Sequence, residues 1–159
     1  MNYLDKYFIF YFLFNLFFVI GIFDVTMIFC DSKIPCSFLW ITEDISKGIY
    51  EHAKENDLIM YNQPIWYMVT IWFGLIFWTP FHILATYAFI MKKNWIRIPC
   101  TAYSSVMFLI MIQGISEQIW GIYPTSCINC VLRDNFIWLI TPIILIIRMK
   151  NQPFKIKTD

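Results

Sequence analysis

The sequence contains few charged residues, since only 14% of its 159 residues are Asp, Glu, Lys or Arg. It also lacks a surplus of either sign, because 12 basic and 11 acidic residues leave a formal net charge of +1. A soluble domain has about 25% charged residues. The shortage argues against a soluble enzyme and against a disordered chain. The balance of charge excludes a basic surface for nucleic acid.

Hydrophobic residues are abundant instead, at 59% of the chain, and 20% of the residues are aromatic. They are concentrated in four runs, and a helix needs about 20 apolar residues to cross the hydrocarbon core. The first three runs meet this length, and the fourth meets it if Arg148 reaches the interface with its long side chain. The first run is too long for a signal peptide and no small-x-small cleavage site follows it. We therefore predict membrane-spanning helices at about residues 7–29, 65–91, 98–119 and 132–149.

The predicted fold class is thus an all-α integral membrane four-helix bundle that forms a single domain over residues 1–159. Basic residues predict its orientation, because cytosolic loops carry an excess of Lys and Arg. If both termini are cytosolic, eight basic residues lie on the cytosolic side, and the other two loops mix both signs. The eight residues are Lys6, Lys92, Lys93, Arg97, Arg148, Lys150, Lys155 and Lys157.

The lumenal loop over residues 31–63 is the only long polar stretch, and it carries a helical pattern. Apolar residues recur in it at spacings of three to four, which places them on one face of a helix. This predicts a short amphipathic helix that lies on the membrane surface or caps the bundle. Pro64 then marks the start of the second spanning helix. The residues of the apolar face are Phe38, Ile41, Ile45, Ile49 and Ala53.

Four of the five cysteines fall on the predicted lumenal side, where the compartment is oxidising. Cys127 and Cys130 form a C-x-x-C motif, but no second such motif and no nearby His completes a zinc site. We expect no metal and no cofactor. A disulfide from Cys30 or Cys36 in the first lumenal loop to the C-x-x-C motif in the last is the favoured pairing, although spacing alone does not give the connectivity.

The cytosolic tail, residues 150–159, ends with Lys155 and Lys157 at the fifth and third positions from the last residue. This arrangement is similar to a dilysine signal for retrieval to the endoplasmic reticulum, which is read from the cytosol. The alternative is a basic segment that contacts anionic lipid. The first interpretation predicts an endoplasmic-reticulum membrane protein.

Three ionisable residues lie inside apolar runs, where a charge costs at least about 2.5 kcal/mol, and such residues are functional candidates. Asp24 in the first helix and Glu117 in the third are predicted at similar depth, facing one cavity. Two carboxylates in such a cavity would suit a cationic amphiphile or a sterol hydroxyl. Glu117 has an alternative role in contact with lumenal water. His82 also has an alternative role, as the hydrogen-bond partner of a backbone carbonyl that Pro80 leaves free.

A distinctive set of residues runs from the second predicted helix through the loop after it into the third: Trp66-Tyr67, Pro80-Phe81, Ala85-Thr86-Tyr87-Ala88-Phe89, Trp95-Ile96-Arg97, Pro99 and Tyr103-Ser104. This set resembles the EXPERA superfamily, and most closely its sigma-2 receptor family. Phe23-Asp24 occupies the place of that family's helix-one aspartate, and His52-Ala53-Lys54 followed by Asp57 resembles its lumenal loop.

The resemblance implies a four-helix protein of the endoplasmic reticulum with a pocket that opens toward the bilayer. In that family Asp24 would pair with the amine of cationic ligands and Asp57 would support it. Members bind sterols, influence cholesterol handling and can form homodimers. Asn135, Trp138 and Pro142 are similar instead to the emopamil-binding sterol isomerase. In that enzyme the Asn and Trp line the pocket and the indole offers a cation–π face.

The sequence departs from both families in the second helix. Gly74 stands where both have a glutamate, Trp78 stands where the sigma-2 family has a glutamine, and the helix contains no acid. We therefore weigh three hypotheses. The first is a non-enzymatic sterol-, lipid- and cationic-amphiphile-binding protein, the second a sterol Δ8–Δ7 isomerase, and the third a membrane adaptor with a vestigial pocket.

An isomerase needs an acid and a base within reach of the substrate, and Asp24 and Glu117 would have to fill these roles. Under the first hypothesis there is no catalytic residue. The partners are a sterol or lipid-like small molecule and membrane lipid, with no nucleic acid. The predicted ligand-binding residues are Asp24, Asp57, Trp78, Glu117, Asn135 and Trp138.

Overall fold

The computed structural model describes residues 2–30, 36–125, 127–150 and 153–154, and over these ranges it contains helices and no β-strand. Four helices are long and apolar enough to cross a membrane: Tyr3–Phe29, Ile65–Ile90, Asn94–Trp120 and Ile128–Met149. The predicted all-α four-helix membrane bundle is confirmed. The proposed dilysine signal lies outside the described residues.

Two of the four spans change their helical winding partway along. The first consists of α1 (Tyr3–Phe14), the π-helix η1 (Asn15–Asp24) and α2 (Val25–Phe29). The second consists of α5 (Ile65–Phe73), the π-helix η2 (Gly74–Trp78) and α6 (Thr79–Ile90). Pro80 lies in the first turn of α6, where its missing N–H does not interrupt the helix.

The third span begins with the 3₁₀ turn η3 (Asn94–Ile96) and continues as α7 (Arg97–Trp120), and the fourth is α8 (Ile128–Met149). The helix α8 begins earlier than predicted, at a residue capped by Cys127, whose sulfur accepts the N–H of Cys130. Cys127 and Cys130 are also disulfide-bonded, as are Cys30 and Cys36. The predicted disulfide between the two loops is therefore wrong, because each bond closes within its own loop.

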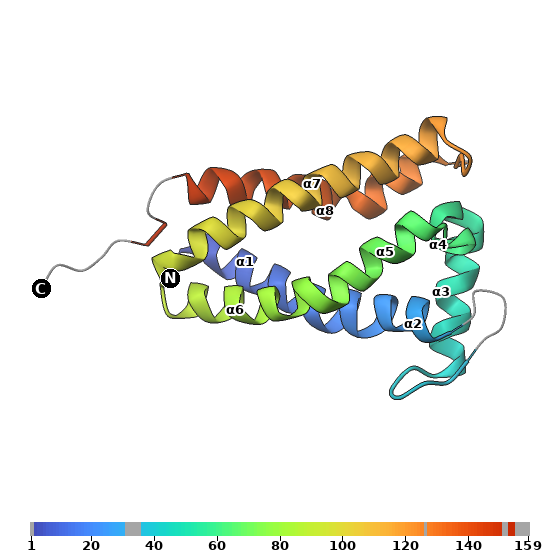
Figure 1. The fold of residues 1–159 in the computed structure, drawn as a ribbon, viewed down its shortest axis with the longest axis horizontal. Coiled ribbons are helices and arrows are strands. Elements are labelled where there is room, and N and C mark those ends of the chain that lie inside the picture. Colours follow the sequence, from blue (N-terminus) through green and yellow to red (C-terminus); the bar gives the residue numbers. More distant parts are fainter. Residues whose placement is uncertain (1, 31–35, 126, 151–152, 155–159) are drawn as a thin grey trace, which may run out of the picture.

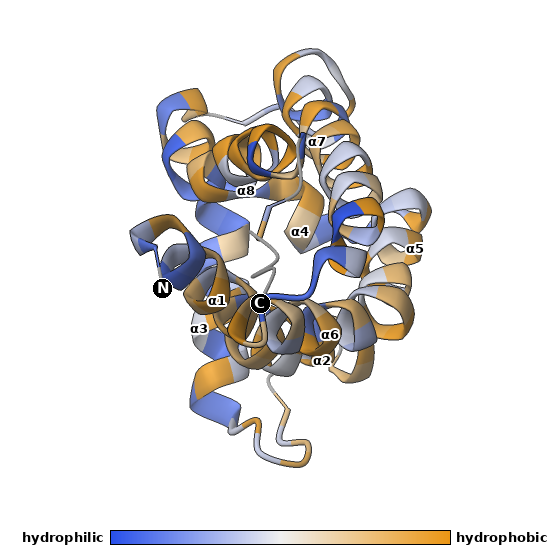
Figure 2. Ribbon diagram, turned by 90° about the vertical axis from the view of Figure 1, so that its left-hand side faces the viewer, coloured by the Kyte–Doolittle hydropathy of each residue, from blue (hydrophilic) through white to orange (hydrophobic). Residues whose placement is uncertain are grey.

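The spans pack as two pairs, with α7 beside α8 and the first span beside the second (Figure 1). The start of α1 and the end of α8 lie at one end of the bundle, and α3 and α4 lie at the other, which we call the α3 end. The core at the end away from α3 contains buried aromatic residues, among them Phe8, Phe12, Phe89 and Tyr103. Phe17, the most lipid-accessible phenylalanine of the first span, is 69% exposed. Figure 2 shows hydrophobic residues along the outer faces of the spanning helices, as contact with lipid requires.

The predicted amphipathic helix is present as α3 (Glu43–Asn56), and it runs across the end of the bundle (Figure 1). Thr42 caps it by accepting the N–H of Ile45. Ile49 and Ala53 are buried against the bundle as expected. Phe38 and Ile41 instead precede the helix, where their backbones pair across a turn, and the Ile45 side chain is exposed.

A second short helix that the sequence pattern did not predict, α4 (Leu58–Asn62), follows α3 directly. It ends at Gln63, which has a left-handed backbone (φ 48°), and Pro64 then precedes α5 as predicted. Together α3 and α4 cover the α3 end of the bundle, and α4 contacts α7.

Candidate functional site

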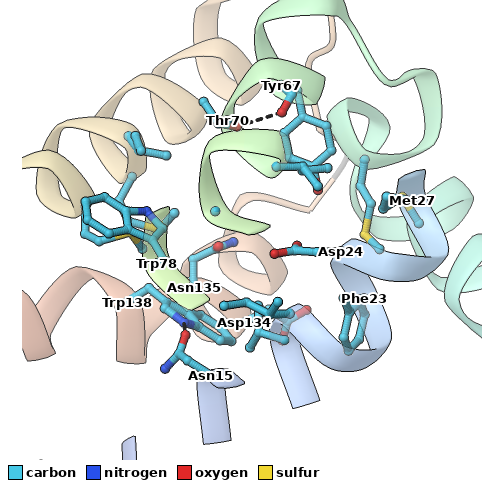
Figure 3. Close-up of a pocket in the computed structure, with 18 of the residues that line it drawn as sticks. Asn15, Phe23, Asp24, Met27, Tyr67, Thr70, Trp78, Asp134, Asn135 and Trp138 are labelled. Atoms are coloured by element: carbon cyan, nitrogen blue, oxygen red, sulfur yellow. Dashed lines mark hydrogen bonds between the residues drawn. The ribbon is translucent and has the colours of Figure 1, made fainter. Parts of the chain in front are cut away.

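A cavity of about 340 Å³ lies among the spans toward the α3 end, and residues from all four spans and from α3 and α4 line it. This volume falls within the range of small-molecule sites. Of the six predicted ligand-binding residues, the structure brings five to the cavity wall: Asp24, Asp57, Trp78, Asn135 and Trp138 (Figure 3).

The π-helix in the first span explains how two of its polar residues reach the same cavity. Asn15 and Asp24 are nine residues apart, and at about 100° per residue an α-helix would place them on opposite sides. A π-helix bonds i to i+5, as Val25 N–H does to the Ile20 carbonyl, and winds nine residues into about two turns. Both side chains therefore face the cavity.

Asp24 is the acidic residue of the first span that faces the cavity. Its carboxylate points into the cavity (Figure 3), and among the described residues it accepts no hydrogen bond and has no ion-pair partner. Gly74 lies beside it, where a Cβ atom would stand 3.4 Å from Oδ2 of Asp24. The lack of a side chain at Gly74 therefore leaves space next to the carboxylate.

Asp57 lies at the α3 end of the cavity, outside the spans, and it has a structural role of its own. Its Oδ1 accepts the N–H groups of Ile59 at 3.1 Å and Met60 at 3.0 Å, which caps α4. Burial raises the pKa of this carboxyl above 3.8, while hydrogen bonds from Met60, Ile59 and Gln118 and the nearby His52 lower it by less. Asp57 thus shapes the cavity by holding α4 in place.

Trp138 forms part of the wall because the first span holds its indole. Its Nε1 donates to Oδ1 of Asn15 at 2.8 Å, and Nδ2 of Asn15 donates to the carbonyl of Tyr11 at 2.8 Å. The neighbouring Asn135 donates to the carbonyl of Val131 at 3.0 Å. Asn15 therefore positions Trp138. Sequence reasoning missed this role, although a buried Asn in an apolar run was its signal.

Trp78, which lies in η2, contributes another part of the wall. Its ring packs edge-on against Tyr103, with 4.9 Å between ring centroids, and edge-on against Phe73 at 5.0 Å. The bond from Thr79 N–H to the Gly74 carbonyl shows the π winding at this point. Because π winding adds a residue per turn, Gly74, Trp78 and His82 all face the cavity at intervals of four.

Glu117 is the sixth predicted ligand-binding residue, and it is not among the residues that line the cavity. It lies in the last turn of α7, where Oε1 accepts the N–H of Ile122 at 2.8 Å. The prediction that Asp24 and Glu117 face one cavity is corrected accordingly. Glu117 instead binds the backbone N–H of Ile122, which lies just beyond the C-terminal end of its own helix.

The charged side chains that line the cavity are acidic. Asp24, Asp57 and Asp134 line it, and no Lys or Arg occurs among its described lining residues. Asp134, which sequence reasoning missed, accepts a 2.7 Å hydrogen bond from Arg133 and lies 3.7 Å from Nε2 of His52. Since Asp134 has a cationic neighbour in Arg133 and Asp57 has hydrogen-bond donors, Asp24 is the acid left to attract a ligand cation.

Comparison with known protein families yields one finding. The family model described as EBP: EXPERA (EXPanded EBP superfamily) matches residues 46–149. The matched range extends from α3 to the end of α8 and includes the second, third and fourth spans. No curated protein and no solved structure matches the chain.

The raised pKa of Asp57 leads to a prediction about stability and pH. Because the folded protein binds this proton more tightly than the unfolded chain, the contribution of Asp57 to stability falls as pH rises from 3.8 through the raised pKa. Asp57→Asn keeps a side chain that caps helices but does not titrate. We expect its melting temperature in detergent, relative to the unaltered protein, to rise with pH across this window.

Asp57→Ala provides the matched comparison, because it removes the cap together with the charge. Relative to Asp57→Asn, it should lower the free energy of unfolding by about 1 kcal/mol at every pH in the window, because neither replacement titrates. A melting-temperature difference between Asp57→Asn and the unaltered protein that stays constant over the window would contradict the raised pKa.

Proposed function

Because the chain belongs to the EXPERA superfamily, we propose that it is a sterol-related, multi-pass membrane protein that binds cationic amphiphiles and sterol- or lipid-like molecules without transforming them, in the manner of the sigma-2 receptor. The observation that carries the proposal is the carboxylate of Asp24, which faces a mostly apolar cavity without a cationic partner. A charge in such surroundings is costly unless a ligand pairs with it.

The shape of the site supports a ligand with a cationic end and an apolar body. Trp78 and Trp138 present aromatic faces that can attract an ammonium group or pack against rings. Asp57 supports the end of the cavity by capping α4. The apolar body would lie along the remaining wall, to which Ile71, Met107 and other aliphatic side chains contribute.

The isomerase hypothesis receives less support from the geometry. That reaction adds a proton at one carbon of the substrate and removes one from another, so an acid and a base must both reach it. Asp24 and Glu117 do not share the cavity, and Gly74 provides no carboxylate in the second span. The acid–base pair expected for that reaction is therefore not assembled in the cavity, and the proposal rests on binding.

We propose further that the protein resides in the endoplasmic-reticulum membrane with both termini in the cytosol. Lys92, Lys93 and Arg97 lie in and next to the turn between α6 and α7, at the same end of the bundle as the start of α1. Arg148 and Lys150 follow at the end of α8. This end thus carries the excess of basic residues that the cytosolic side of membrane proteins prefers.

The proposed amine site predicts a loss of affinity when the charge of Asp24 is removed. Asp24→Asn should weaken binding of a hydrophobic tertiary amine by at least about a hundredfold, because a hydrogen-bonded charge pair is lost. Calorimetry or radioligand binding on purified protein measures this. Since Asp24→Asn places an asparagine two residues before Thr26 and so creates a glycosylation acceptor, Asp24→Ser is made in parallel.

Glu43→Gln is the matched control, because this acid is exposed in the first turn of α3 and should leave affinity unchanged. A neutral isostere of the amine, with carbon in place of nitrogen, should bind the unaltered protein and Asp24→Asn alike. Undiminished amine affinity in both Asp24 variants would remove the proposed site.

A second prediction separates binding from catalysis. Expression of the chain in cells that lack sterol Δ8–Δ7 isomerase should leave their accumulated Δ8-sterol unchanged, because the cavity holds no second proton-transfer group of the predicted pair. Sterol analysis by gas chromatography provides the measurement, with a functional isomerase as positive control. A fall in Δ8-sterol would establish an enzyme and overturn the non-enzymatic proposal.

The orientation can be tested with a single substitution. Asp44 is exposed in the first turn of α3, and Asp44→Asn creates an N-x-S acceptor with Ile45 and Ser46 in a chain that has no natural N-x-S/T acceptor. In the proposed orientation this site is lumenal, so the variant should gain a glycan that endoglycosidase H removes. A variant that stays unglycosylated while a lumenal reporter in the same cells is modified would argue for the opposite orientation.

A further inference from the structure

His82 is a polar side chain in the cavity wall that none of the roles above uses. It lies in α6, its side chain is 2% exposed, and its ring forms part of the lining of the cavity that holds Asp24. Its Nδ1 is fully enclosed and has no hydrogen-bond partner, and Nε2 has none among the described residues. The expected bond to a backbone carbonyl freed by Pro80 is absent there.

The surroundings of His82 explain why this isolation matters. Three aromatic rings pack around the imidazole: Phe12 at 5.8 Å, Phe81 at 5.5 Å and Tyr103 at 5.3 Å between centroids. The hydroxyl of Tyr103 is already paired with Tyr11 at 3.0 Å. A buried polar group without a partner is costly, and buried polar side chains nearly always have one. The protein thus leaves a hydrogen-bonding group unsatisfied at this end of the cavity.

The distance between His82 and Asp24 follows from the helix that carries His82. The carboxylate of Asp24 lies beside Gly74, and His82 follows Gly74 by eight residues on the same side of the second span. At 1.5 Å per residue of α-helix, positions 74 and 82 are at most about 12 Å apart along the axis, because the wider winding of η2 rises less per residue. The wall between them is formed by Trp78 and other mainly apolar side chains.

We propose that His82 binds a second polar group of the ligand, so that the cavity selects elongated molecules with a hydrogen-bonding oxygen about 12 Å from the cationic amine. Nδ1 is enclosed by protein, so the ring nitrogen open to a ligand is Nε2. In the neutral imidazole Nε2 is either a donor or an acceptor according to the tautomer, and a hydroxyl can pair with it in both cases. The inference rests on the proposed function, because it takes Asp24 as the site of the amine. It adds the ligand class, which is an amphiphile that is polar at both ends, and His82 as the residue that determines this specificity.

Three synthetic probes test the inference. All carry the same tertiary amine and a rigid apolar body. The first ends in a hydroxyl about 12 Å from the nitrogen, the second ends in a methyl group at that place, and the third carries its hydroxyl at about half the distance. Their affinities are measured by calorimetry for the purified unaltered protein, for His82→Phe and for His82→Gln.

We expect the unaltered protein to prefer the long hydroxyl probe to the methyl probe by about tenfold, which is the effect of one satisfied hydrogen bond in a buried site. His82→Phe should prefer the methyl probe, because the hydroxyl then has no partner. His82→Gln should keep part of the original preference. The short hydroxyl probe should gain nothing over the methyl probe in the unaltered protein, because its hydroxyl does not reach His82.

Equal affinities of the unaltered protein for the long hydroxyl and methyl probes would overturn the role of His82, as would an unchanged preference in His82→Phe. If all probes still lose affinity in Asp24→Ser, the proposed amine site stands while this inference fails. If no probe binds the unaltered protein, the proposed function and this inference fail together.

The melting temperature of His82→Phe should match or exceed that of the unaltered protein, because an unsatisfied polar group is replaced among aromatic rings.

Discussion

The structure depends on one constraint, which is that a carboxylate in the hydrocarbon region must be kept away from lipid. Asp24 meets this constraint by facing an internal cavity rather than the acyl chains. The glycine at position 74 keeps the space beside the carboxylate open, and Asp57 at the α3 end caps the short helix that borders the same cavity. A larger residue at position 74 would fill the space beside the carboxylate, and loss of the Asp57 cap would release the short helix that borders the cavity.

The π-helical segments turn the polar residues of the spans toward the cavity and away from lipid. An α-helix that placed Asn15 on the cavity would turn Asp24 toward the opposite side, because nine residues make two and a half α-helical turns. The wider winding of η1 brings both residues to one face, and η2 does the same for Gly74 and His82 in the second span. Irregular winding at these positions thus coincides with the candidate site, as it often does in helical proteins.

Polar groups inside the bundle fall into two kinds. Asn15 is satisfied within the protein, and it fixes the indole of Trp138 in the cavity wall. Asp24 and His82 have no partner among the described residues, and both face the cavity. Asn15 therefore shapes the site, whereas Asp24 and His82 indicate which polar groups a ligand would have to provide. The distinction is physical, because each unpaired polar group in an apolar enclosure costs free energy until a ligand supplies its partner.

The four spans, the amphipathic helix between the first two spans and the start of the second span at Pro64 could be predicted from the sequence alone, because hydrophobic length and periodicity are local properties. The sequence also singled out Asp24, since an acid is conspicuous in an apolar run. Only the tertiary structure decided that Glu117 binds its own helix end, that the disulfides close within each loop, and that Asn15 and His82 face the cavity. These outcomes depend on helical winding and on contacts between distant segments, which no local pattern encodes.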